Sequence, residues 1–236
     1  MAKCTASKPQ LIYFNVPGRV AGLRIVMFKV YGKDGWEDRR VDFKDWPAIK
    51  PTLPLQFLPV LILPDGRKVH QADAILRWAG KKAELYPTDP DQALFVDEMI
   101  STVYEALSKG PRPSSIIKPE MLPTLWKDFT EGPLKMYFDY IQKQLSVGPF
   151  FAGDSKDDMS IADLALYMLV NYFVNGEIPH VASSYMDGWP KIVRNYAAVK
   201  SHPLVKAYEV AYAVGVEEID KVAEFANVDT SKIGKE

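Results

Sequence analysis

Apolar and polar residues change their spacing along this chain of 236 residues, and the change divides it into two parts. In the first part, residues 11–14 form a short apolar run, and residues 37–43 alternate as a half-buried strand does. Between them, apolar residues recur at three- and four-residue steps over residues 19–31, which is helical spacing. The pattern therefore predicts a strand, a helix and a second strand.

Residues 57–75 continue this part with an apolar run, a turn at residues 64–67, a short return and helical spacing. The pattern predicts an antiparallel strand pair that leads into a helix. Pro59 has no N–H and favours an extended Leu58, so the backbone of Leu58 is a candidate to pair with a ligand. The free N–H groups of residues 71–73 form a candidate carboxylate site. The alternative is an ordinary hairpin followed by an ordinary helix.

The second part, from residue 91 onward, has no convincing strand. Amphipathic helices are predicted in five segments: 92–107, 122–145, 160–175, 189–199 and 203–214. Ser160 and Asp163 have the spacing of a capping box, so we expect Asp163 to serve folding rather than catalysis. The fold class is thus an α/β thioredoxin-like N-terminal domain at residues 8–84, followed by an all-α domain at 91–214 and a tail at 215–236. Residues 45–54, rich in proline, are expected to be irregular, and residues 81–90 to be a linker.

Composition narrows the class of protein. A formal net charge of −1 argues against a general nucleic-acid partner, and no apolar run approaches the ~20 residues that span a membrane. The first ten residues lack the apolar core of a signal peptide, and the single Cys4 cannot form an intrachain disulfide, so a cytoplasmic location is expected.

The chain also lacks several kinds of catalytic motif. Its three histidines are far apart and predict no metal site, and we find no phosphate-binding loop, nucleophile elbow or paired-cysteine motif. A protein that has a thioredoxin-like layer but no dithiol of its own is expected to use the thiol of a bound ligand.

Several ordered motifs occur at compatible spacing: residues 11–15 (LIYFN), 18–19 (GR), 45–54 (DWPAIKPTLP), 58–61 (LPVL) and 70–75 (HQADAI). Together they resemble the N-terminal half of a cytosolic glutathione transferase of the sigma class. Residues 151–154 (FAGD) and 160–163 (SIAD) are similar to the capping motif of that family's helical half. The resemblance covers about residues 10–213. It implies glutathione as a substrate, no metal cofactor and a homodimer.

The resemblance assigns catalysis to two residues. Tyr13 matches the tyrosine whose hydroxyl donates to the glutathione sulfur, and Arg19 matches an arginine beside it. A free thiol has a pKa of about 8.5, so a phenol O–H directed at the sulfur favours the nucleophilic thiolate. Without the resemblance, Tyr13 reads as a core tyrosine of a strand and Arg19 as a partner in a salt bridge at the helix start.

By the same resemblance, glutathione is held along its whole length. Trp46 and Lys50 match residues at its glycine end, Leu58 with a cis Pro59 matches the cysteinyl site, and Gln71 with Ala72 matches the γ-glutamyl site. Phe57 and Asp73 complete the set of contacts. Glu105 lies near the position where the family places an acidic residue that reaches the glutathione of the partner subunit.

This chain also departs from the family pattern. Sigma-class proteins usually have a serine where Ala72 stands, the carboxylate of Asp73 would repel an anionic ligand, and Phe57 replaces a residue that is commonly polar. The second substrate is expected near Phe14, Val16 and Arg112, where residues 110–113 replace the aromatic residue of prostaglandin-isomerising members.

These features predict an enzyme that joins the glutathione thiolate to small hydrophobic electrophiles. The alternatives are a non-catalytic ligand-binding or crystallin-like member of the same fold and a glutathione-dependent isomerase such as a prostaglandin D synthase. A peroxidase side activity would use the same thiolate.

Overall fold

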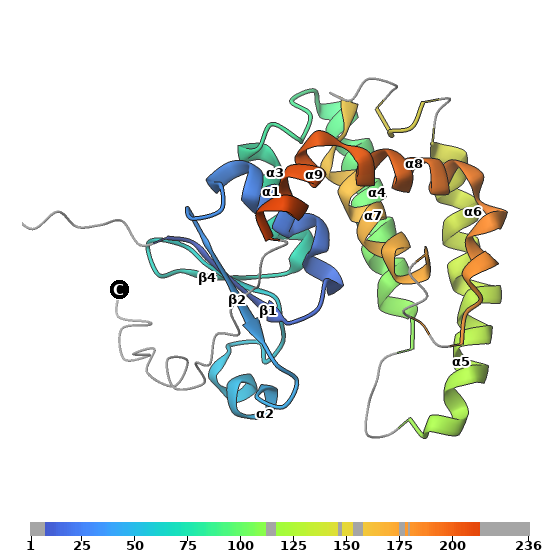
Figure 1. Cartoon of the computed structure of the whole chain (residues 1–236), viewed down its shortest axis with the longest axis horizontal. Coiled ribbons are helices and arrows are strands. Elements are labelled where there is room, and N and C mark those ends of the chain that lie inside the picture. The colour runs from blue at the N-terminus through green and yellow to red at the C-terminus, as the bar shows by residue number, and fades with distance from the viewer. Residues whose placement is uncertain are drawn as a thin grey trace, which may run out of the picture.

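The computed structural model describes residues 8–111, 117–145, 148–152, 158–174, 178 and 180–212. Its sheet has four strands in the order β2-β1-β3-β4 (Figure 1). The strands are β1 (Gln10–Phe14), β2 (Glu37–Val41), β3 (Val60–Ile62) and β4 (Lys68–His70). Strand β2 runs parallel to β1, and β3 pairs antiparallel with both β1 and β4. The predicted strand–helix–strand unit and the hairpin that follows it are both confirmed.

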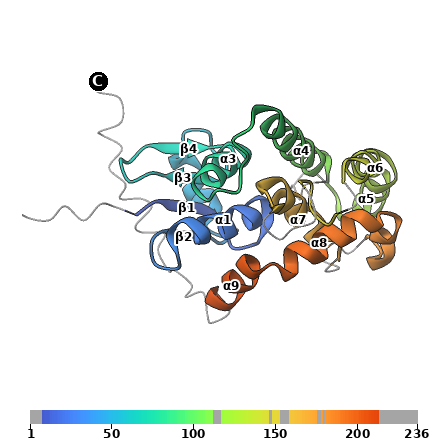
Figure 2. The same cartoon turned by 90° about the horizontal axis from the view of Figure 1, so that it is seen from above.

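Three helices belong to the first part of the chain: α1 (Ala21–Tyr31), α2 (Trp46–Ile49) and α3 (Ala72–Lys82). The described residues of the second part include no strand, and its helices are α4 (Pro90–Lys109), α5 (Leu122–Phe129), α6 (Lys135–Gln144), α7 (Ile161–Val174), α8 (Pro190–Ser201) and α9 (Pro203–Tyr212). Helices α1 and α3 pack together between the sheet and the helical part (Figure 2). The predicted α/β layer followed by an all-helical part is therefore confirmed.

Helix α7 lies at the centre of the molecule and contacts α1, α4 and α8. Most of its residues are buried, which explains why its sequence is apolar on nearly every face. Its close approach to α1 depends on Gly22, because a Cβ atom there would lie 2.6 Å from the backbone oxygen of Leu164. The two parts of the chain thus share a tightly packed helix contact.

The predicted capping box at the start of α7 is confirmed. The Asp163 carboxylate accepts the backbone N–H of Ser160 at 2.8 Å, and the Ser160 hydroxyl accepts the N–H of Ala162 at 3.2 Å. Asp163 also accepts from the backbone of Phe151 and from the side chain of Asn195. Burial raises the pKa of Asp163, although these donors act in the opposite direction. Asp163 joins three segments of the fold, as a structural residue does.

Three sequence predictions were wrong in detail. Residues 122–145 do not form one helix, because the turn Thr130–Leu134, which contains Pro133, is a π-helix between α5 and α6. Proline cannot donate the helical hydrogen bond and its ring crowds the preceding turn, so a wider turn accommodates it.

The segment 45–54 is helical where an irregular segment was expected. It contains α2 and a 3₁₀ turn at Lys50–Thr52, each with a proline in its first turn, where the missing N–H costs no helical bond. The predicted strand at 37–43 ends at Val41, and Phe43 lies beyond it with 65% of its surface exposed.

No helix in the described part of the chain is long and apolar enough to cross a membrane. The tail predicted at residues 215–236 and Cys4 lie outside the described residues.

Candidate functional site

Tyr13 lies near the end of β1 and is almost completely buried, with 7% of its surface exposed. Its hydroxyl oxygen accepts the backbone N–H of Arg19 at 3.1 Å. This bond occupies a lone pair of the oxygen and leaves the phenol proton available for another acceptor. It also polarises the hydroxyl group, so the O–H becomes a stronger hydrogen-bond donor.

Gly18 makes this position of Tyr13 possible. Its φ of +46° lies in the left-handed region, and a Cβ atom there would be 2.5 Å from Cε1 and 2.6 Å from the hydroxyl oxygen of Tyr13. Glycine meets both requirements because it has no Cβ. The tyrosine ring therefore lies directly against the backbone of the loop that carries Arg19.

A second tyrosine holds this loop from the helical part of the chain. Tyr104 of α4 donates its hydroxyl to the backbone oxygen of Arg19 at 3.0 Å, and burial raises the pKa of Tyr104, which keeps it protonated. The role of Tyr104 was missed in the sequence, where it belongs to the apolar face of a helix. The available signal was its hydroxyl, because a buried tyrosine needs a hydrogen-bond partner.

Aromatic residues line the chain beside Tyr13. Phe14 stacks on Phe43 with ring centroids 4.7 Å apart and meets Trp46 edge-on at 5.3 Å. Trp46 is the first residue of α2, and Lys50 follows this helix on an exposed turn. The two residues assigned to the glycine end of glutathione therefore come from one short helical segment.

The Leu58–Pro59 peptide bond is cis, as the resemblance predicted. Strand β3 begins at Val60, so Leu58 lies outside the sheet ladder. Phe57 packs edge-on against His70 with ring centroids 5.4 Å apart. This segment thus leads from a bend directly into the centre of the sheet.

Helix α3 begins from a strained residue. Gln71, at its N-cap, has φ 73° and ψ 105°, a conformation that is uncommon outside glycine, and Ala72 is the first residue of the helix. Such outliers cluster at ligand-binding sites. Asp73 forms a salt bridge with Arg77 at 2.8 Å, and Arg77 also contacts Asp97 of α4 at 2.6 Å. The negative charge of Asp73 is therefore partly neutralised within the chain.

The remaining predicted residues are more widely spread. Val16 lies on the wall of a separate cavity between α1, α7 and α9. Glu105 is exposed on α4, 3.7 Å from Lys109. Arg112 lies outside the described residues. Within the described ranges, no group of three or more histidine, cysteine or acidic residues is arranged to hold a metal ion.

Residues 118–211 match the family model described as "Glutathione S-transferase, C-terminal domain". The chain is 28% identical to the glutathione S-transferase class-mu 28 kDa isozyme of Schistosoma japonicum, over 73% of this chain and 87% of that protein. It is 35% identical to glutathione S-transferase S1 of Drosophila melanogaster, over 49% of this chain and 47% of that protein.

The fold is similar to the solved structure of prostaglandin synthase D of Nilaparvata lugens, with a TM-score of 0.73 and 25% identity. The similarity covers 89% of this chain and 100% of that structure. The matched C-terminal domain, the relatives and the shared fold show that this chain is similar to glutathione S-transferases, and they fix no class among them.

Proposed function

We propose that this protein is a glutathione transferase of the sigma-class type and that Tyr13 stabilises the glutathione thiolate. The observation that carries the proposal is the hydrogen bond from the Arg19 N–H to the Tyr13 oxygen at 3.1 Å. Because the Tyr13 oxygen accepts this N–H, its own O–H is free to donate to a sulfur atom. Tyr13 therefore acts as a hydrogen-bond donor to the anion, and the side chain of Arg19 adds positive charge beside it.

The reaction that follows is a nucleophilic substitution or addition. The thiol proton is lost to solvent, the thiolate sulfur forms a bond to an electrophilic carbon, and any leaving group departs with its electron pair. Tyr13 lowers the free energy of the thiolate and so increases the fraction of glutathione in the reactive form.

Glutathione would extend across the ends of several elements. Lys50 would pair with the glycine carboxylate beside Trp46, and the backbone of Leu58, next to Pro59 and Phe57, would pair with the cysteinyl unit. Gln71 and the N–H of Ala72 would receive the γ-glutamyl end, where the helix dipole of α3 favours a carboxylate. The salt bridge from Arg77 to Asp73 supports this assignment, because it reduces repulsion of the ligand.

The electrophile would bind beside the β1–α1 loop against Phe14, Val16 and Arg112. We further propose the division into a glutathione-binding domain at residues 8–84 and a helical domain at 91–214. In a homodimer, Glu105 would contact the partner subunit.

The decisive experiment measures conjugation of glutathione to 1-chloro-2,4-dinitrobenzene by the wild type and by Tyr13→Phe. Losing a hydrogen bond to a charged group costs about 1.5–3 kcal/mol, so kcat/KM should fall roughly tenfold to a hundredfold. Tyr31→Phe, at the far end of α1, serves as the control and should retain the wild-type rate. An inactive wild type, or a fully active Tyr13→Phe, would refute the proposed role.

A second candidate function is a glutathione-dependent prostaglandin D synthase. It is favoured by the similarity in fold to the Nilaparvata lugens prostaglandin synthase D. Supplying prostaglandin H2 with glutathione separates the two functions, because an isomerase forms prostaglandin D2 and releases its glutathione unchanged. Binding of glutathione with neither product formed would favour the non-catalytic alternative.

A further inference from the structure

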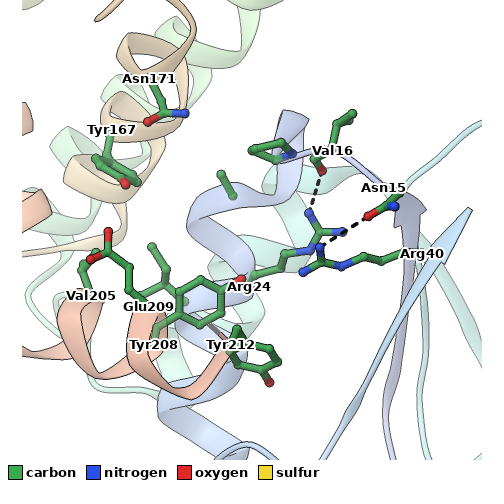
Figure 3. A pocket seen from close by; sticks show the side chains of 13 residues that line it. Asn15, Val16, Arg24, Arg40, Tyr167, Asn171, Val205, Tyr208, Glu209 and Tyr212 are labelled. Atoms are coloured by element: carbon green, nitrogen blue, oxygen red, sulfur yellow. Dashed lines mark hydrogen bonds between the residues drawn. The ribbon is translucent and has the colours of Figure 1, made fainter. Parts of the chain in front are cut away.

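A cavity of about 360 Å³ lies between the β1–α1 loop, α1, α7 and α9. Figure 3 shows Arg24 and Arg40 on its sheet side and Tyr208, Glu209 and Tyr167 on its helical side. Among the residues proposed above for glutathione and the electrophile, only Val16 lines this cavity. Its volume falls in the range of small-molecule sites, which begins near 300 Å³.

The sheet side of the cavity carries an excess of positive charge. Arg24 and Arg40 both contact one carboxylate, that of Asp38, with Nε of Arg24 at 3.0 Å from Oδ1 and Nη2 of Arg40 at 2.9 Å from Oδ2. The side chains of Arg24, Asp38 and Arg40 are only 3%, 8% and 20% exposed, so solvent screens this excess weakly. Two guanidinium groups against one carboxylate leave one positive charge for a ligand to neutralise.

Arg40 is the residue best placed to meet that ligand. Its guanidinium group donates to the carboxylate of Asp38 and, at 3.5 Å, to the side-chain oxygen of Asn15. A guanidinium has five N–H donors, so donors of Arg40 remain for an anion in the described structure. Arg24 is more deeply buried and also donates to the backbone oxygens of Val16 and Phe14. These bonds hold its guanidinium group in place at the bottom of the cavity.

The helical side of the cavity is neutral and largely apolar. Glu209 is paired with Lys206 at 2.7 Å, so its charge is compensated. Burial raises the pKa of Tyr208 to about 12 and also raises the pKa of Tyr167, so both phenols stay uncharged. Val205 adds a fully buried apolar side chain to the lining. A ring or short hydrocarbon would therefore bind against these residues.

We propose that this cavity is a second binding site, distinct from the Tyr13 site, for a small amphipathic monocarboxylate. Its carboxylate binds Arg40, with the amide of Asn15 beside it, and its aromatic or aliphatic body packs against Val205 and the tyrosine rings of α7 and α9. This site goes beyond the proposed transferase function and does not depend on it.

Isothermal titration calorimetry with 2-naphthylacetate tests the proposal, with its uncharged analogue 2-naphthylacetamide as the ligand control. Both titrations use full-length protein saturated with S-hexylglutathione, a glutathione thioether that occupies the proposed Tyr13 site. We expect the acid to bind about tenfold or more tightly than the amide, because only the acid neutralises the excess charge. Equal affinities, or no binding of the acid, would overturn the proposal.

Variants locate the bound acid. Arg40→Gln should weaken its binding about tenfold, while Arg40→Lys, which keeps the charge, should recover part of the loss. Arg39→Gln is the matched control, because this substitution removes the same charge from the adjacent residue of β2. The side chain of Arg39 contacts Gln10. An equal effect of Arg39→Gln and Arg40→Gln would show that net charge, and not this cavity, governs the binding.

Discussion

Tyr13 owes its position to a residue without a side chain. Gly18 combines a positive φ with direct contact to the Tyr13 ring, whereas Gly66 has φ +87° and nothing within 4 Å of an added Cβ. Gly18→Ala should therefore cost more than the ~1–2 kcal/mol of a non-glycine residue at positive φ, which is all that Gly66→Ala should cost. Urea denaturation measures both. Conjugating activity should also fall in Gly18→Ala alone; equal stabilities of the two variants would mean that the Tyr13 ring has room to move.

Ala72 is the residue at which restoring a hydroxyl should improve the site. It is buried at the first position of α3, directly after the strained Gln71. A serine there would add one hydrogen bond to the γ-glutamyl carboxylate, worth about 1.5–3 kcal/mol. Ala72→Ser should therefore tighten glutathione binding roughly tenfold or more, as measured by calorimetry. Ala74→Ser, on the exposed face of the same helix, should leave the affinity unchanged. An unchanged or weaker affinity of Ala72→Ser would show a different arrangement of the ligand.

Helix α4 and the β1–α1 loop are joined by one hydrogen bond across 85 residues of sequence, from Tyr104 to the backbone of Arg19. Tyr104→Phe keeps the ring and removes the hydroxyl, which leaves a largely buried carbonyl oxygen without this donor. We expect a loss of stability of about 1 kcal/mol.

Because Arg19 also donates to Tyr13, the same change should raise the pKa of the bound glutathione thiol, measured from thiolate absorbance against pH. Tyr196→Phe is the control, because its hydroxyl contacts Asn171 in the helical part of the chain. It should change stability by a similar amount and leave the thiol pKa as in the wild type. A thiol pKa unchanged in Tyr104→Phe would limit Tyr104 to a structural role.

Elements with a strong local signal were predictable from the sequence. The apolar spacing of residues 19–31 corresponds to the 3₁₀ turn Gly18–Val20 and α1, and the Ser160–Asp163 spacing located the start of α7. Weak or conflicting signals were misread, as at Pro133, where the apolar spacing continued through a proline and concealed a π-helical turn. Phe43 was misread for a similar reason, since alternation alone does not fix where a strand ends.

At the scale of the whole molecule, contacts between distant segments were beyond reach of pattern reasoning. Arg24, Asp38 and Arg40 come from α1 and β2, and only the fold brings them together. Arg24 did carry a signal, because it lies one turn from Val20 on an apolar face where a charge needs a partner. The assignment of glutathione contacts came from the resemblance, since spacing alone predicts a bend and a helix start but not their ligand.

The proposed homodimer makes a prediction about one exposed face of α4. Leu94 is 70% exposed and lies eleven residues before Glu105, which is about three whole turns, so both residues point to the same side of α4 and are roughly 16 Å apart along its axis. If Glu105 contacts the partner subunit, then Leu94, on the same side of the helix, faces that interface as well. Leu94→Glu would therefore place an unpaired charge in the interface.

We therefore expect light scattering after size-exclusion chromatography to give the mass of two chains for the wild type and of one chain for Leu94→Glu. Val210→Glu, on α9 and 75% exposed, adds the same charge to an equally accessible apolar position and should remain dimeric. A wild type with the mass of one chain would overturn the dimer itself. A dimeric Leu94→Glu would instead assign the interface to another surface. Burying an unpaired carboxylate costs so much free energy that a dimer of ordinary affinity would dissociate.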